Sequence, residues 1–453
     1  MVLLAIIFLT ITFEPEAFSI SIFPGAQGFG TSTPAGRGGQ VYKVTNLNVS
    51  GAGSLKACVD AVGPRVCVFE VSGPIDISSL GAWGLRIKNP YITIAGQTAP
   101  SPGIMVRGAP LIIETHDVLV QHIRIRPGDT PGSGCATGPD NCDAIAIVDL
   151  DNQNDVYNVV IDHCSMSWTI DEMLSTWYPG VRDVTVKDSI MAEALLDSLH
   201  PKGPHGYGPI IGTNSSNISL TGNLIAHNYQ RNALLNPGTK AVLANNLIYN
   251  AGALSTHADA RLGLKSAIVG NVYIKGVDTS GLKPVYLFNA DSTASVYVSD
   301  NSAAGATSNP WSVVSIVPSD VITHASTPPV WVPQLTVRPS TEVKGWVLSN
   351  AGARPADRDP VDTRIVNDAK NGTGRIINCV APDGSARCQK NAGGWPVLAK
   401  NYRALALPAN PSGDDDADGY TNLEEWLHSY SAVVEGKAMT AKVPNPPTML
   451  IVE

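Results

Sequence analysis

The chain has 453 residues, of which only 15% are charged, and its formal net charge is −8. This acidic balance argues against nucleic acid as a partner, although a bound divalent cation could still attract an anionic substrate. Few charges together with 42 glycines favour a β-rich protein with many tight turns over a helical enzyme.

The amino-terminal stretch has the pattern of an export signal. Residues 2–13 form an almost unbroken apolar run, and a polar segment follows at residues 14–19. About a dozen apolar residues are too few to span a bilayer, but they match the core of a secretory signal. We therefore predict that residues 1–19 are a signal peptide and that the protein is secreted, with a buried first strand as the alternative. No other stretch is long and apolar enough for a membrane span, so no membrane is expected as a partner.

Short β-rich stretches recur along the chain, and each ends where a glycine or a polar residue turns the backbone. Successive turns lie about 25 residues apart, which is the spacing of one coil in a stacked β-solenoid. They fall at Gly96, His122, His163, Asp188, Asn223, Asn246, Asn271 and Asn301. The intervals after His122 and after Asp188 are longer. Insertions on one face of a solenoid are where binding sites are built, so the site is expected there.

The seven cysteines support export. Six of them form close pairs in the sequence, Cys58 with Cys67, Cys135 with Cys142 and Cys379 with Cys388, while Cys164 is left over. Such spacing favours disulfides in an oxidising compartment over metal binding, because the chain has no Cys-x2-Cys pair. We expect Cys164 to be a buried core residue. An exported chain could also be a glycoprotein, since Asn-x-Ser/Thr sequons occur at Asn48, Asn214, Asn217 and Asn371.

Several motifs resemble those of one enzyme family. They are FPGAQGFG, GSLK, AGQTAP, VIDH and RDPVDTRIV, at residues 23–30, 53–56, 95–100, 160–163 and 358–366. Through them the chain is similar to secreted pectate lyases that fold as a right-handed parallel β-helix. The resemblance implies an all-β fold with an irregular carboxyl-terminal extension. We place a signal peptide at 1–19, a β-helix catalytic domain at 20–310 and the extension at 311–453, and we expect a monomer.

Pectate lyases catalyse β-elimination, in which a base removes the C5 proton of a galacturonate and the C4–O bond breaks. Calcium neutralises the substrate carboxylate and acidifies that proton. The resemblance implies that Asp143, Asp171 and Glu172 hold this Ca²⁺. A simple turn cap is the alternative reading of Asp171 and Glu172. Two other acidic positions of the family are replaced here by Asn141 and Ser175, and a second arginine is replaced by Asn236. Asp140 is a candidate to compensate for the lost negative charge.

The resemblance also assigns the remaining catalytic parts. Arg231 corresponds to the arginine that acts as the base, and a solvated surface arginine is the alternative. The second long interval contains Lys202, His205 and Tyr207 among glycines and prolines, and we expect these side chains to bind a substrate carboxylate. For His205, packing within the loop is an equal alternative.

A separate motif near the carboxyl terminus has the spacing of an EF-hand calcium loop. Oxygen ligands at positions 1, 3, 5, 7, 9 and 12 with glycine at position 6 define such a loop, and they correspond here to Asp414, Asp416, Asp418, Tyr420, Asn422 and Glu425, with Gly419. We predict a structural Ca²⁺ site at residues 414–425, with a solvated acidic turn as the alternative.

The favoured function is therefore a calcium-dependent pectate lyase acting on pectate or a related polyuronate. A polygalacturonan hydrolase is the second possibility, since it would need clustered carboxylates but neither Arg231 nor calcium. A non-catalytic glycan-binding β-helix is the third, encouraged by the replaced family positions. We expect Asp162 and His163 to be structural, as a turn and part of a corner ladder.

Overall fold

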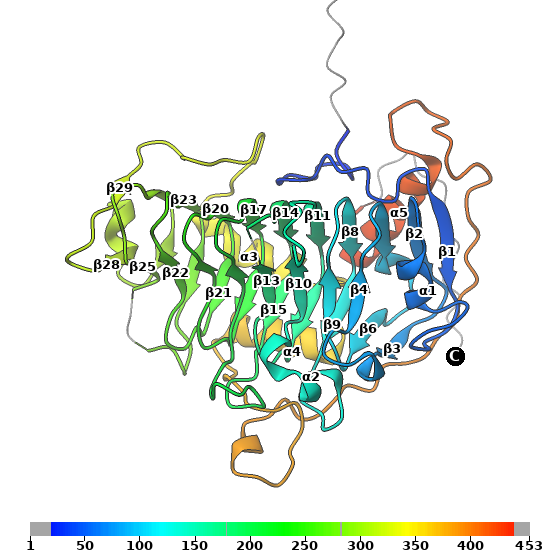
Figure 1. Ribbon diagram of the computed structural model, residues 1–453, viewed down its shortest axis with the longest axis horizontal. Helices are drawn as coiled ribbons and strands as arrows, with labels where there is room; N and C mark the ends of the chain where they lie inside the picture. Colours follow the sequence, from blue (N-terminus) through cyan, green and yellow to red (C-terminus); the bar gives the residue numbers. More distant parts are fainter. Residues whose placement is uncertain (1–19, 178, 281–282, 439–453) are drawn as a thin grey trace, which may run out of the picture.

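The computed structural model describes residues 20–177, 179–280 and 283–438, and within them the chain winds as a parallel β-helix (Figure 1). Each coil passes through three sheets in turn, so that strands of successive coils pair in parallel. The predicted β-solenoid is confirmed. The expected signal peptide lies outside the described residues, among which no helix is long and apolar enough to cross a membrane.

The three sheets take every third strand. Sheet 1 contains β1 (Gln40–Val44), β2 (Arg65–Phe69), β5 (Ile92–Ala95), β8 (Val118–Gln121), β11 (Tyr157–Asp162), β14 (Arg182–Lys187), β17 (Ser216–Thr221), β20 (Lys240–Ala244), β23 (Lys265–Val269), β26 (Ser295–Ser299) and β29 (Thr323–His324). Sheet 2 contains β3 (Gly73–Asp76), β6 (Ile104–Arg107), β9 (Ile123–Arg126), β12 (Ser165–Ser167), β15 (Ile190–Ala192), β18 (Leu224–Ala226), β21 (Leu247–Tyr249), β24 (Val272–Ile274) and β27 (Ser302–Ala303). Sheet 3 contains β4 (Leu85–Ile87), β7 (Leu111–Ile113), β10 (Ile145–Val148), β13 (Leu174–Trp177), β16 (Ile210–Ile211), β19 (Leu234–Leu235), β22 (Thr256–Asp259), β25 (Val285–Phe288) and β28 (Val314–Ile316).

The turning residues predicted from the sequence form the corner between sheets 1 and 2. At this corner an asparagine ladder runs along the solenoid, because the side-chain amide of each asparagine donates to the side-chain oxygen of the next. The distances are 3.0 Å from Asn223 to Asn246, 2.9 Å from Asn246 to Asn271 and 3.0 Å from Asn271 to Asn301. Each of the first three amides also donates to a backbone carbonyl, so the polar groups of a tight, buried corner are satisfied.

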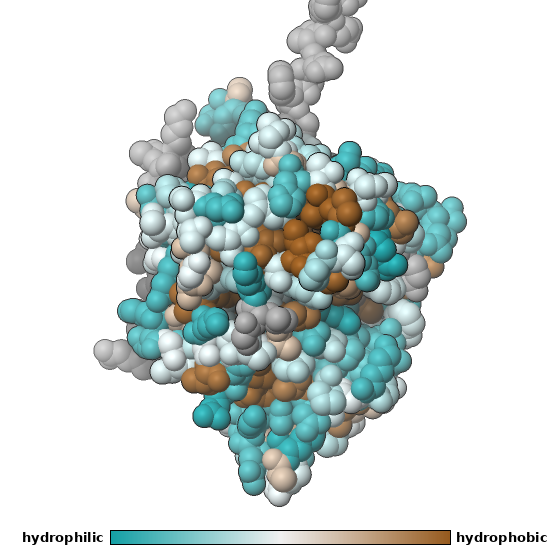
Figure 2. Space-filling model, turned by 90° about the vertical axis from the view of Figure 1, so that its left-hand side faces the viewer, coloured by the Kyte–Doolittle hydropathy of each residue, from teal (hydrophilic) through white to brown (hydrophobic). Residues whose placement is uncertain are grey.

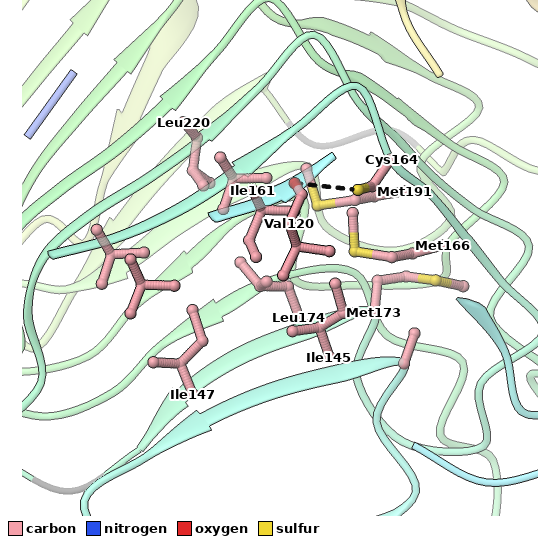
Figure 3. Packing of buried hydrophobic residues seen from close by; sticks show 14 of the residues in the cluster. Val120, Ile145, Ile147, Ile161, Cys164, Met166, Met173, Leu174, Met191 and Leu220 are labelled. Carbon is pink, nitrogen blue, oxygen red and sulfur yellow. Dashed lines mark hydrogen bonds between the residues drawn. The ribbon is translucent and has the colours of Figure 1, made fainter. Parts of the chain in front are cut away.

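The core consists of apolar side chains stacked in rows along the solenoid. In sheet 1, Val120 lies in register with Ile161, and that row continues to Leu220. In sheet 3, Ile145 lies in register with Leu174. Figure 3 shows these rows facing one another across the interior, together with the thiol of Cys164, which donates to the carbonyl of Val120 at 3.6 Å. Cys164 is buried and unbridged, and the three predicted disulfides are present.

Helices and irregular segments cover two sides of the β-helix. Helices α3 and α4 pack on the outside of sheet 2, and α5 packs on sheet 1 (Figure 1). The helical segments are α1 (Leu55–Asp60), α2 (Gly134–Thr137), α3 (Ser340–Asn350), α4 (Pro360–Asn371) and α5 (Asn422–Glu435), with short 3-10 turns η1 (Ser78–Leu80), η2 (Gly96–Thr98), η3 (Pro139–Asn141), η4 (Pro310–Val313) and η5 (Arg387–Gln389).

Helix α4 is fixed by buried charges. Strand β9 points Arg124 and Arg126 outward, and both meet carboxylates near the start of α4. The Nε of Arg124 lies 3.2 Å from Asp362, and Nη2 of Arg126 lies 2.7 Å from Asp362 and 3.1 Å from Asp359. All four side chains are fully buried. The RDPVDTRIV motif thus serves to dock the extension on the solenoid, since leaving either arginine unpaired would be costly.

Figure 2 shows the end of the solenoid formed by its last coil, where brown apolar patches lie between polar side chains. The last coil supplies half-buried apolar side chains that pack against the core, among them Trp311, Ile316 and Ile322. Trp311 stacks on His324 with ring centroids 3.5 Å apart. Strands β28 and β29 therefore continue the β-helix beyond residue 310 and close its interior.

Candidate active site

The two insertions lie side by side at the corner between sheets 2 and 3. Glu172 lies in register with Tyr207 of the next coil, and Tyr207 with Gln230 of the coil after that. One coil earlier, Asp143 precedes β10 as Glu172 precedes β13, and these two strands pair in register. Because successive coils are only about 4.8 Å apart, residues nearly 90 positions apart in the sequence meet at this corner.

Three buried carboxylates form an acidic cradle here, made of Asp143, Asp171 and Glu172. Their oxygens lie within 4.8 Å of one another. The backbone N–H of Glu172 donates to Asp143 Oδ1 at 3.1 Å, and the Ser175 hydroxyl donates to Oδ2. Burial raises the pKa of Asp143 well above its usual range, and the nearby charge of Asp171 adds to this shift. The cradle therefore concentrates negative charge that a bound cation would stabilise.

The donor set of the cradle fits calcium. Ca²⁺ is a hard cation that prefers carboxylate oxygens, and all three candidates present them. Asp171 is 8% exposed, and its Oδ1 accepts no hydrogen bond. Ser175 and Asn141, at two positions that are acidic in the resembled family, are neutral and add no charge to the cradle. The Ser175 hydroxyl instead donates to Asp143, and Asn141 is exposed. Asp140, the candidate to compensate for the lost charge, is exposed as well.

Arg231 lies against the cradle. Its Nη1 is paired with Glu172 Oε1, and its guanidinium carbon lies 4.2 Å from the ring centroid of Tyr207. The side chain is only 22% exposed, so Arg231 is not a freely solvated arginine. Burial lowers the pKa of Arg231, while the charges of Asp171 and Asp143 act in the opposite direction. Any change that neutralises those carboxylates would therefore favour the uncharged guanidine.

Two histidines of the second insertion contact the other side of the cradle. Nε2 of His205 lies 2.9 Å from Oδ1 of Asp171, although the two groups are not aligned as a hydrogen bond. His200 stacks on His205 with ring centroids 3.6 Å apart, and its Nε2 lies 3.8 Å from Asp171. Burial lowers the pKa of His200. The sequence analysis missed His200, because its stacking on His205 depends on how the loop folds.

The remaining substrate candidates lie at different depths. Tyr207 is half-buried between His205, whose ring centroid is 4.0 Å away, and Arg231. Lys202 is exposed, and its backbone N–H donates to Nδ1 of His200 at 3.2 Å. The structure thus brings Tyr207 and His205 to the cradle and places Lys202 at the outer surface of the same loop.

The EF-hand-like segment runs into the first turn of α5, which contains Asn422 and Glu425. Asp414 accepts backbone hydrogen bonds from Asp418 at 3.2 Å and from Gly419 at 3.0 Å, so the loop folds back on its first acidic residue. Gly419 has a φ of +96°, which glycine adopts without strain. Burial raises the pKa of Glu425, and the neighbouring acidic residues of the loop, Asp416 first, add to the shift. These oxygens fit a calcium ion in their chemistry, although the loop aspartates are exposed.

A cavity of about 450 Å³ lies at the corner between sheets 1 and 2, under α5, and no cradle residue lines it. Its wall includes His163 and Glu435, whose Nε2 and Oε2 are 3.7 Å apart. His122 stacks on His163, and its Nε2 lies 3.4 Å from Glu435. Asp162 binds Nδ1 of His163 at 2.9 Å. The VIDH motif therefore holds α5 on the solenoid, away from the cradle.

Comparisons with known proteins show the family to which the chain belongs. No family model matches the chain. Curated relatives include probable pectate lyase C from Neosartorya fischeri, 32% identical over 92% of this chain and 95% of that protein, and probable pectate lyase C from Aspergillus oryzae, 31% identical over 90% and 93%. The chain belongs to the pectate lyase family. It is accordingly a polysaccharide lyase, and the alternative of a non-catalytic β-helix is not supported.

Solved structures of pectate lyases share the fold. One, bound to a hexasaccharide, is 16% identical with a TM-score of 0.52 over 75% of this chain and 99% of that chain. Another, used to study substrate specificity and the anti β-elimination mechanism, is 15% identical with a TM-score of 0.51 over 74% and 98%. At this level of identity the likeness concerns the β-helix alone.

Proposed function

We propose that this chain is a secreted, calcium-dependent pectate lyase that cleaves (1→4)-linked galacturonan by β-elimination. The observation that carries the proposal is the meeting of three buried carboxylates with one partly buried arginine at a single corner of the β-helix. β-Elimination needs a cation beside the substrate carboxylate and a base beside the C5 proton, and this corner offers candidates for both.

Arg231 is the proposed base. In the resting site its guanidinium is paired with Glu172 and rests on the Tyr207 ring. We propose that substrate takes the place of Glu172, after which Arg231, in its uncharged form, accepts the C5 proton. Burial already lowers the pKa of Arg231, and an alkaline medium would raise the uncharged fraction further.

Asp143, Asp171 and Glu172 are the proposed ligands of the catalytic Ca²⁺. When bound, the ion would neutralise the substrate carboxylate and so make the C5 proton more acidic. His205 and Tyr207 are proposed to orient the bound uronate from the neighbouring coil. Lys202 is proposed to attract a further carboxylate from the outer edge of the loop.

An inverting hydrolase with the same cradle is disfavoured by spacing. Inverting hydrolases hold their two carboxyl groups roughly 6.5–9.5 Å apart to leave room for water, whereas the oxygens of the cradle lie within 4.8 Å of one another. We propose further that residues 414–425 bind a structural Ca²⁺ through Asp414, Asp416, Asp418, Tyr420, Asn422 and Glu425. This second ion would hold the start of α5, and so the extension, on the catalytic β-helix of a monomeric protein.

Product analysis tests the reaction type. Oligogalacturonide of defined length is incubated with the protein and calcium, and the fragments are weighed by mass spectrometry. Elimination gives one fragment that is lighter by a water molecule than the matching hydrolysis product. Fragments that have all gained water would contradict the proposal.

A further inference from the structure

The outward surface of sheet 3 runs along the solenoid on both sides of the cradle. Residues alternate between the two faces of each strand, and Ile112, Ala146 and Val148 form an apolar cluster separate from the core. Ser175, the donor to Asp143, lies in register with Ala146 and so joins this surface to the cradle. We call this surface the outer track; its members are Ile112, Ala146, Val148, Ser175, Trp177, Ile210, Leu234, His257, Asp259, Tyr286 and Phe288.

The strands of the outer track carry no cationic side chain. From β7 to β25, none of the seven described strands of sheet 3 contains lysine or arginine. Arginines at the margins are already paired: Arg261 holds Asp259 at 2.6 Å, Arg86 holds Glu114, and Arg231 holds Glu172. A fully ionised polyuronate would therefore place successive carboxylates against apolar and acidic side chains.

Aromatic rings take the place of cations. Trp177 is 43% exposed and lies in register with Val148. Further along sheet 3, Tyr286 and Phe288 are half-buried on β25, with ring centroids 5.7 Å apart and an interplanar angle of 15°. This pair lies two strands beyond β19, which Arg231 precedes. Apolar and aromatic surface binds neutral groups well, whereas it removes water from a charged group without replacing it.

We propose that the outer track binds uronate residues whose carboxyl groups are methyl-esterified, while the cradle takes one ionised uronate. The proposal rests on the lyase function proposed above and names its substrate class: partially methyl-esterified galacturonan. A methyl ester carries no charge and presents an apolar methyl group, which suits Trp177 at the end of β13 and the Tyr286–Phe288 pair on β25. The acidic cradle and a bound cation require one ionised residue, and Lys202, which is exposed and lies outside the outer track, can take a further carboxylate.

The first test compares substrates. The full chain is assayed by ultraviolet absorbance of the unsaturated product, at fixed calcium, on polygalacturonate and on galacturonans of increasing methyl-esterification. We expect kcat/KM to be several-fold higher on partially esterified galacturonan than on polygalacturonate. A steady decline with esterification would overturn the proposal and leave the lyase function standing. Absence of unsaturated product from every substrate would refute the lyase function and the proposal with it.

The second test adds charge to the outer track. Phe288→Lys and Trp177→Lys are compared with Phe288→Leu and Trp177→Leu, which remove the ring without adding charge. Since an exposed charge pair is worth up to about 1 kcal/mol, or roughly fivefold, each lysine variant should shift the kcat/KM ratio of polygalacturonate to esterified galacturonan by up to about fivefold towards polygalacturonate. The shift should shrink at high salt.

Equal ratios in the lysine and leucine variants would overturn the proposal. A binding measurement keeps the test independent of turnover. Isothermal titration in chelator with esterified and de-esterified oligogalacturonides should show tighter binding of the esterified form, and Phe288→Leu should weaken that binding. Tighter binding of the de-esterified form by the unaltered protein would contradict the assignment of the outer track.

Discussion

Replacing Arg231 with glutamine separates a catalytic role from a structural one. The amide cannot accept the C5 proton, but it can still donate a hydrogen bond towards Glu172. Because Arg231 is 22% exposed and Glu172 only 9%, losing the ion pair should cost about 1–3 kcal/mol of folding free energy. A domain of ordinary stability, about 5–15 kcal/mol, would remain folded after such a loss.

Loss of the base should be much larger than this structural effect. Positioned proton transfer contributes roughly 10²–10⁴-fold to a rate, so we expect kcat of Arg231→Gln to fall by at least about 100-fold, measured as growth of absorbance on a galacturonan substrate. Thermal unfolding of the same sample should show a shift of a few degrees. The control is Arg107→Gln, which breaks an exposed pair with Asp76 on sheet 2 and should keep most of its activity. If Arg231→Gln kept more than a tenth of kcat while folded, Arg231 would not be the base.

Four further outcomes follow from the geometry. Asp143→Asn should raise the calcium concentration for half-maximal rate at least about tenfold, since it removes one of three ligand carboxylates; an unchanged calcium titration would exclude Asp143 as a ligand. Glu425→Gln should reduce the rise in Tm that calcium produces, and an equal rise in both proteins would rule out a calcium site at residues 414–425. Asn246→Ala should lower the free energy of unfolding, measured by urea denaturation, by about 3 kcal/mol or more, because it leaves buried partners in two coils unpaired. A loss below about 1 kcal/mol would contradict the ladder's role. Burial alone would raise the pKa of Glu435, but His163 and His122 lower it to about 2, while Asp162 and Glu435 raise the pKa of His163 against burial. Glu435 therefore stabilises the fold above its unfolded pKa of about 4.3 and loses this effect as the pH falls towards 2, whereas His163 stabilises it below about 6.5 and loses this effect as the pH rises through its raised pKa. The difference in free energy of unfolding between wild type and Glu435→Gln should peak between about pH 4.5 and 6.5. A difference that does not change with pH would argue against the pairing.

The solenoid could be predicted from the sequence because its contacts repeat. Each coil meets the next about 25 residues later, so turning residues such as His163 and Asn246 reveal their neighbours by spacing alone. Asp143 and Glu172, by contrast, were expected together because of the family resemblance, and the stacking of coils about 4.8 Å apart only allows such residues to meet.

Contacts outside the repeat could not be read in this way. Arg124 alternates with isoleucines in β9, a pattern that suggests a solvated face, yet it is buried against Asp362, 238 residues later. Glu435 meets His163 across an even longer separation. In the site, the stacking of His200 on His205 depends on how the second insertion folds, which no period encodes.

The central claim is calcium-dependent elimination with Arg231 as the base. The most direct measurement follows ultraviolet absorbance while the full chain acts on galacturonan at alkaline pH, first with calcium, then with excess chelator, and in parallel with Arg231→Gln. We expect absorbance to grow with calcium, to stop on chelation and to resume when calcium is restored, with almost no growth for the variant. Growth that continues in chelator, or that survives in Arg231→Gln, would contradict this mechanism.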